Sequence, residues 1–220
     1  MTRPQPVIEL HGLGLHIGDT PILRNLNLTV EAGEVIGIHG GNGSGKTTLL
    51  RVAATLLGPT KGSGTVLGAD LFGDGRFTVR SQIEMIGHAP ALYPQLTLEE
   101  NTAFVATVTG RSQNRVGEAL DKVGLGGARH RRVDQCSHGM QRRAEFARVL
   151  LTGPDLLLLD EAHAGLDPEA ADLVSVITKL TTTRGGAVIL VTHDAARAAA
   201  IVDRAYETEA GHLRDLGEDR

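Results

Sequence analysis

Residues 40–47 have the types and spacing of a loop that binds phosphate. They read Gly-Gly-Asn-Gly-Ser-Gly-Lys-Thr, which fits the pattern G-x-x-x-x-G-K-[ST] between an expected strand and an expected helix. Glycines let successive backbone N–H groups approach a phosphate with no Cβ in the way, and the positive end of the helix points at the same oxygens. The alternative is a glycine-rich turn with a surface lysine, and the strand–loop–helix context disfavours it.

The ligand predicted from this loop is a nucleoside triphosphate with Mg²⁺. Lys46 is expected to reach the β- and γ-phosphates, and the Thr47 hydroxyl is expected to bind Mg²⁺. The other binding residues expected here are Gly40, Asn42, Gly43, Ser44, Gly45 and Thr48. The pattern does not indicate what work the triphosphate drives.

Two carboxylates, Asp160 and Glu161, directly follow the apolar run 156–159. A parallel strand buried on both faces must be apolar, and ligands bind at the carboxyl ends of such strands. Asp160 is then placed to hold Mg²⁺ through water, and Glu161 to orient or deprotonate the attacking water. The alternative, that Asp-Glu only begins a helix and favours its dipole, is weaker with a phosphate loop upstream.

A second apolar run, at 187–191, ends in Thr192-His193-Asp194. A histidine at the end of a parallel strand beside the first one would reach the γ-phosphate, so His193 is a candidate catalytic residue. By itself the signal is weak, because most histidines are structural or solvated.

These residues need an α/β core to bring them together. Residues 34–39, 156–160 and 187–192 are expected strands, and 48–57 and 169–183 are expected helices, an alternation typical of a parallel sheet. Residues 7–15 and 26–30 alternate as half-buried antiparallel strands do, and the glycine-rich stretch 58–75 indicates turns and edge strands. From about residue 80 to 151 the pattern predicts helices, with expected helices at 100–109, 115–123 and 140–151.

The predicted fold class is therefore α/β, with a phosphate-loop NTPase core built on a parallel sheet. We expect one domain in three parts. Residues 1–79 and 152–220 form the nucleotide-binding core together with an N-terminal antiparallel β subdomain, and residues 80–151 form an inserted helical subdomain.

Composition limits the partners and the compartment. The formal charge of −4 argues against a chain built to hold nucleic acid. Cys136 is the only cysteine, so no internal disulfide can form and a reducing compartment is expected. No run approaches the ~20 apolar residues that cross a bilayer, and the N-terminus lacks a secretory signal pattern. We expect a soluble, cytoplasmic protein whose membrane role, if it has one, depends on a partner.

Taken in order, these segments resemble the ATPases of the ATP-binding cassette (ABC) family over nearly the whole chain. Residues 136–143, Cys-Ser-His-Gly-Met-Gln-Arg-Arg, are similar to the family's signature, usually LSGGQ, and open an expected helix before Asp160. Residues 164–167, Ala-Gly-Leu-Asp, resemble the family's D-loop, and His193 matches its switch histidine. No other phosphate-loop class carries all of these segments in this order.

The resemblance implies a shared site. Two such domains pack head to tail, with a triphosphate between the phosphate loop of one chain and the signature of the other. Ser137 and Gly139, at the amino end of their helix, would then face the γ-phosphate bound to the partner, and Asp167 would lie at the catalytic interface. The implied partners are a second copy of the chain or a homologous ATPase subunit, and a separate transmembrane permease. The implied location is the inner face of the cell membrane, held there through the permease.

The chain departs from the family pattern at three places. His138 and Met140 replace a glycine and the usual glutamine of the signature, and His138 is expected to point away from the phosphates. His88 stands near the position of the Q-loop glutamine, in a Gly-His-Ala-Pro segment similar to the haem-exporter ATPases of cytochrome c maturation. Where the family often stacks an aromatic ring on adenine, this chain offers His16 as a candidate for stacking and Ile17 for apolar contact with adenine, so we expect weak discrimination of ATP from GTP.

The function implied is ATP hydrolysis that drives transport, with a small exporter favoured over an importer. The main alternative is a non-transport ABC ATPase, a class that usually carries coiled-coil inserts, tandem cassettes or basic extensions. A phosphate-loop kinase or small GTPase is a third possibility, and the signature and D-loop speak against it.

Overall fold

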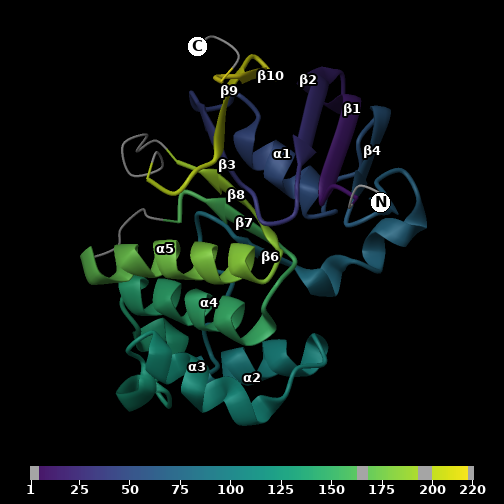
Figure 1. Ribbon diagram of the computed structural model, residues 1–220. Coiled ribbons are helices and arrows are strands. Elements are labelled where there is room, and N and C mark those ends of the chain that lie inside the picture. The colour runs from purple at the N-terminus through teal and green to yellow at the C-terminus, as the bar shows by residue number, and fades with distance from the viewer. Residues whose placement is uncertain (1–4, 163–167, 193–199, 218–220) are drawn as a thin grey trace.

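A computed structural model describes residues 5–162, 168–192 and 200–217. The chain builds a parallel-rich sheet, a smaller antiparallel sheet and a layer of helices, arranged as Figure 1 shows. Among the described residues, no helix is both long enough and apolar enough to cross a membrane.

The six-stranded sheet has the order β10-β9-β3-β8-β7-β6. Strands β9, β3, β8, β7 and β6 run parallel to one another, and β10 pairs antiparallel with β9. The strand bounds are β3 Val35–Gly40, β6 Ile83–Ile86, β7 Leu156–Asp160, β8 Ala187–Val191, β9 Arg204–Glu209 and β10 His212–Asp215.

Alternate residues of the central strands belong to two separate cores. Leu156 and Leu158 of β7 pack with the antiparallel sheet and α1 (Lys46–Ala53), whereas Leu157 and Leu159 pack with the helical layer. Every residue of β7 and β8 is buried. A strand covered on both faces must be apolar throughout, which is why these two runs lack the alternation of an exposed strand.

The antiparallel sheet has the order β2-β1-β4-β5 and covers α1 on the side away from the helical layer (Figure 1). Its strands are β1 Ile8–Ile17, β2 Thr20–Val30, β4 Lys61–Val66 and β5 Ala69–Asp70. The pairing of β1 with β2 shifts register three times, so the two strands do not keep one strict alternation along their length.

The helical layer lies on the opposite face of the parallel-rich sheet. In Figure 1, α5 and α4 lie next to the sheet, and α2 and α3 lie beyond them. The helices are α2 Leu98–Val108, α3 Val116–Lys122, α4 His138–Thr152 and α5 Pro168–Thr183. Short 3-10 turns occur at Asp74–Phe77, Arg80–Gln82, Gln113–Arg115, Gly126–Ala128 and Val133–Gln135.

The predicted fold class is confirmed, and two element predictions are wrong. The first helix was expected at 48–57 and instead spans Lys46–Ala53. It ends early because Thr55 takes a left-handed backbone conformation (φ 59°), which cannot continue a right-handed helix. The pattern from residue 80 was expected to be helical, yet Ile83–Ile86 is the edge strand β6, paired with β7. Only four residues long, with Glu84 in it, β6 lacks the apolar length that marks β7 and β8.

Candidate nucleotide site

The phosphate loop runs from the end of β3 to the start of α1. Gly40 takes φ 142°, and a Cβ built on it would lie 2.3 Å from the Thr208 carbonyl oxygen on the neighbouring strand β9. The hydroxyls of Ser44 and Thr208 lie 2.7 Å apart in a hydrogen bond. Glycine at position 40 therefore lets the loop lie directly against β9, which fixes its path.

Lys46 is folded back onto its own loop. Its ammonium group donates to the carbonyl oxygens of Gly40 and Gly41, each at 2.8 Å, and the residue is buried. An ammonium group that is held by backbone carbonyls beside an anion-binding loop has its positive charge already placed for a phosphate.

Thr47 and Asp160 supply adjacent hard oxygens. The Thr47 hydroxyl donates to a carboxylate oxygen of Asp160 at 2.7 Å, and Asp160 is buried at the end of β7. Mg²⁺ prefers oxygen ligands and usually takes only one or two from protein, the rest coming from phosphate and water. The pair fits such a site, and the described residues contain no group of three or more His, Cys, Asp or Glu side chains that would hold a metal without a nucleotide.

Glu161 has a backbone conformation rare for its residue type. Its φ is 53°, and its backbone N–H donates to the Val191 carbonyl of β8 at 2.9 Å. Non-glycine residues held in this region are strained, and such strain persists where the surrounding structure over-determines it, often at functional sites. The conformation turns the Glu161 side chain out of the strand line and toward the phosphate loop.

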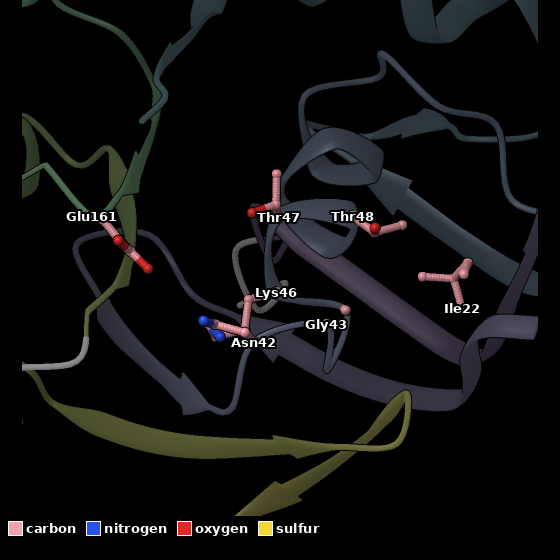
Figure 2. A pocket seen from close by; sticks show the side chains of 8 residues that line it. Ile22, Asn42, Gly43, Lys46, Thr47, Thr48 and Glu161 are labelled. Carbon is pink, nitrogen blue, oxygen red and sulfur yellow. The ribbon is translucent and has the colours of Figure 1, made fainter. Parts of the chain in front are cut away.

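Lys46, Thr47 and Glu161 line one cavity of about 300 Å³, shown in Figure 2, and Asp160 is not among its lining residues. Glu161 faces the loop residues Lys46 and Thr47 across the opening. The cavity is lined by Ile22, Asn42, Gly43, Gly45, Lys46, Thr47, Thr48 and Glu161. Parallel strands bring these groups together, because the segments that follow β3 and β7 leave the sheet at the same edge.

Comparison with known proteins identifies the family. Residues 23–164 match the family model described as "ABC transporter". The chain belongs to the ABC transporter family. It carries that family's ATPase domain, which excludes the kinase and GTPase alternatives.

Its curated relatives include proteins named for different roles. The daunorubicin/doxorubicin resistance ATP-binding protein DrrA of Streptomyces peucetius is 36% identical over 216 residues, covering 96% of this chain and 65% of DrrA. The methionine import ATP-binding protein MetN of Ralstonia nicotianae is 34% identical over 224 residues, covering 96% of this chain and 64% of MetN. The chain thus spans slightly less than two thirds of either relative's length.

Solved structures agree with the family. An ATP-binding subunit of an ABC transporter superposes with a TM-score of 0.88 at 27% identity, covering 96% of this chain and 91% of that one. A dimeric post-hydrolysis structure of the ATP-binding cassette MJ0796, bound to ADP and Pi, has a TM-score of 0.85 at 26% identity, covering 95% of this chain and 98% of that one.

The segment that resembles the family's signature does not line the cavity around Lys46. Ser137 is the N-cap of α4, and its hydroxyl accepts from the Met140 N–H at 3.3 Å. A Cβ built on Gly139 would meet nothing within 4 Å, so the amino end of the helix is open. Neither residue is among those lining the cavity around Lys46.

Two of the three departures from the family pattern, His88 and Ile17, have different surroundings. The His88 ring Nδ1 lies 3.9 Å from a carboxylate oxygen of Glu161, so the segment after β6 approaches Glu161, although His88 itself does not line the cavity. Ile17, at the end of β1, is 58% exposed and does not line the cavity, and its contact with adenine stays a prediction. His193 and Asp167 lie outside the described residues.

Ile22 is a lining residue that sequence reasoning missed. It lies on β2, and its carbonyl oxygen would be 3.2 Å from a Cβ on Gly45. Ile22 is half-buried. The register shifts between β1 and β2 interrupt the alternation of buried and exposed residues that would have predicted which way its side chain points.

Proposed function

We propose that the chain binds ATP with Mg²⁺ and hydrolyses it as the ATP-binding subunit of an ABC transporter. The observation that carries this proposal is the cavity lined by Lys46, Thr47 and Glu161, with Asp160 hydrogen-bonded to Thr47 at its side. Family membership adds the transport role. The 1–79, 80–151 and 152–220 division of the domain is part of this proposal.

In the proposed reaction, the loop's backbone N–H groups and the amino end of α1 hold the phosphates. Lys46 exchanges the carbonyls of Gly40 and Gly41 for β- and γ-phosphate oxygens. Thr47 and Asp160 would hold Mg²⁺, which supplies positive charge to the phosphate oxygens. Glu161 orients and deprotonates the attacking water, and His193 contacts the γ-phosphate.

A complete site needs a second chain in this proposal. Ser137 and Gly139 present an uncovered helix amino end that does not line their own cavity, so the phosphate they bind belongs to another subunit. Asp167 lies at that interface. The dimeric state named for the MJ0796 neighbour supports this arrangement. The partner is a second copy of this chain or a homologous ATPase subunit.

The proposed transport partner is a separate membrane permease, which would hold the chain at the inner face of the cell membrane. We favour export. The Gly-His-Ala-Pro segment around His88 resembles that of the haem-exporter ATPases, and one relative is named for drug resistance. Relatives named for import match at nearly the same identity, so the degree of identity gives no direction.

Hydrolysis is tested on the purified chain with ATP and Mg²⁺. We expect phosphate release from the wild-type chain. Lys46→Ala should lose nucleotide binding, because the ammonium group is the loop's only side-chain cation. Ser137→Ala should bind ATP but release phosphate slowly. Undiminished ATP affinity in Lys46→Ala would remove Lys46 from its assigned role.

Direction is tested with the chain and its permease reconstituted in vesicles. The chain should co-purify with a membrane protein encoded in the neighbouring reading frame. With ATP supplied on the face that carries the chain, an exporter moves its cargo away from that face. Movement toward that face would establish import instead.

A further inference from the structure

Three charged side chains on one face of α4 hold the backbone of the segment 87–91. Arg142 donates to the carbonyl oxygens of Gly87 at 2.7 Å and of His88 at 2.8 Å. A carboxylate oxygen of Glu145 accepts from the Ala91 N–H at 2.9 Å. Arg148 donates to the Ala91 carbonyl at 2.9 Å. The spacing of three residues places all three side chains on the same helix face.

These charges are buried and mutually paired. Arg142 and Glu145 are both 0% exposed and form an ion pair at 2.7 Å. Arg148 pairs with Glu84 on β6, and both of these side chains are nearly buried. Burial raises the pKa of Glu145, and the Ala91 N–H and the two guanidinium groups oppose that effect. Two acids and two arginines form a cluster that is neutral as a whole when all four are charged.

Burying four charged side chains costs free energy, because each charge loses its contact with water. Apolar residues of similar volume often hold two elements together equally well or better. What apolar residues cannot do is bond the peptide groups of a loop. Here every one of the three α4 side chains makes at least one bond to the backbone of residues 87–91, so the cluster determines the conformation of that segment.

The segment 87–91 lies between Glu161 and the helix that Ser137 caps. His88 lies within it, with its ring 3.9 Å from Glu161. Ser137 caps the amino end of the same helix that supplies Arg142. Arg142 thus connects α4 to the His88 backbone, and the His88 ring, whose side chain is 78% exposed, is the group of this segment that approaches Glu161.

We propose that Arg142 and Glu145 are positioning residues that place His88 against Glu161 and so link the signature helix to the catalytic carboxylate. The proposal rests on the ATPase function proposed above. In a two-site dimer, ATP engaged by Ser137 in one site would set the position of Glu161 in the other.

The test removes the pair without leaving a buried charge unpaired. The variant Arg142→Met/Glu145→Leu takes away the bonds to the Gly87 and His88 carbonyls and to the Ala91 N–H. Arg148 keeps its bond to the Ala91 carbonyl, and Glu84–Arg148 remains as a neutral pair. The matched control is Arg204→Met/Glu34→Leu. It removes a partly buried Arg–Glu pair, whose arginine also bonds the Thr29 carbonyl, on the other side of the sheet. Each variant is measured with and without His88→Ala.

The expected results concern kcat for ATP and the affinity for a fluorescent ATP analogue. His88→Ala and the Arg142/Glu145 variant should each lower kcat by about tenfold or more, since small misplacements of reacting groups are costly. Analogue affinity should stay within about twofold, because the phosphate loop is untouched. Combining the two changes should lower kcat no further than either alone, whereas His88→Ala in the control background should give its full effect.

Three outcomes would overturn the proposal: multiplicative losses of kcat in the combined variant, a kcat in the Arg142/Glu145 variant equal to that of the control, or an unchanged kcat in His88→Ala. If the Arg142/Glu145 variant does not fold, Arg142→Lys takes its place in the same cycle, since lysine lacks the two separate terminal nitrogens with which Arg142 bonds Gly87, His88 and Glu145. A wild-type chain that releases no phosphate would instead defeat the ATPase assignment, so the two failures are distinguishable.

Discussion

Gly40 is the residue at which the phosphate loop depends most directly on the absence of a side chain. A Cβ there would lie 2.3 Å from the Thr208 carbonyl and 2.5 Å from its hydroxyl, on a backbone with φ 142°. The neighbouring Gly41 has no atom within 4 Å of a built Cβ. A side chain at position 40 would therefore clash with β9, whereas there is room for one at position 41.

We predict that Gly40→Ala weakens ATP binding at least tenfold, which corresponds to about 1.4 kcal/mol. The added methyl group must push the loop away from β9 and so displace the N–H groups that face the phosphates. Gly41→Ala is the control and should bind nearly as well as the wild type. Titration with a fluorescent nucleotide measures both. Equal affinities for the two variants would show that the loop tolerates this displacement.

Single residues also mark the limit of sequence reasoning. The glycine-lysine pattern predicted Lys46 and Thr47, and the apolar run 156–159 predicted Asp160 and Glu161 at the end of a buried strand. Arg142 and Glu145 carry no such signal. Their role depends on contacts with residues more than fifty positions earlier, and only the packing of α4 against β6 brings them there.

Among the elements, α2 shows how a helix start is specified locally. Thr97 is its N-cap, and its hydroxyl accepts from the Glu100 N–H while the Glu100 carboxylate accepts from the Thr97 N–H, a reciprocal capping box. Thr97→Ala should lower the free energy of unfolding by about 1 kcal/mol, the usual cost of a lost N-cap. Thr107→Ala, on the exposed side of the same helix, is the control and should change it little. Urea unfolding measures both, and equal losses would contradict the capping role.

The same box predicts a pH dependence. The Thr97 backbone N–H, and after it the Thr97 hydroxyl, lowers the pKa of Glu100 below its ordinary value of 4.5. A carboxyl with a lowered pKa in the folded state stabilises that state above its ordinary pKa, and this contribution is lost as the pH falls through the lowered value. The difference in unfolding free energy between the wild type and Glu100→Gln should therefore be largest at neutral pH and shrink below pH 4.5. A difference that is constant across this range would exclude the linkage.

Element types were predictable where one physical requirement dominates. β7 and β8 are buried on both faces and must be apolar, and the glycine-lysine loop needs a strand before it and a helix after it. β6 escaped prediction because four residues, one of them Glu84, give no clear pattern. Its acid is tolerated only because Arg148, distant in sequence, pairs with it.

At the scale of the whole molecule, the parallel sheet determines which distant segments meet. The strand order β3-β8-β7-β6 places the phosphate loop, Thr192, Glu161 and His88 after neighbouring parallel strands, at one edge. The segment predicted to be the signature lies elsewhere, at the amino end of α4. One chain thus provides the phosphate loop with Asp160 and Glu161 in one place and the amino end of α4 in another. Our account therefore requires two chains to complete a nucleotide site.

This central claim is tested most directly by size-exclusion chromatography of Glu161→Gln with ATP and Mg²⁺. The amide cannot deprotonate water, so ATP should persist between two chains. We expect elution at twice the mass of the chain, dependence of that species on ATP, and little phosphate release. A Glu161→Gln chain that stays monomeric with saturating ATP and hydrolyses it at the wild-type rate would contradict the account.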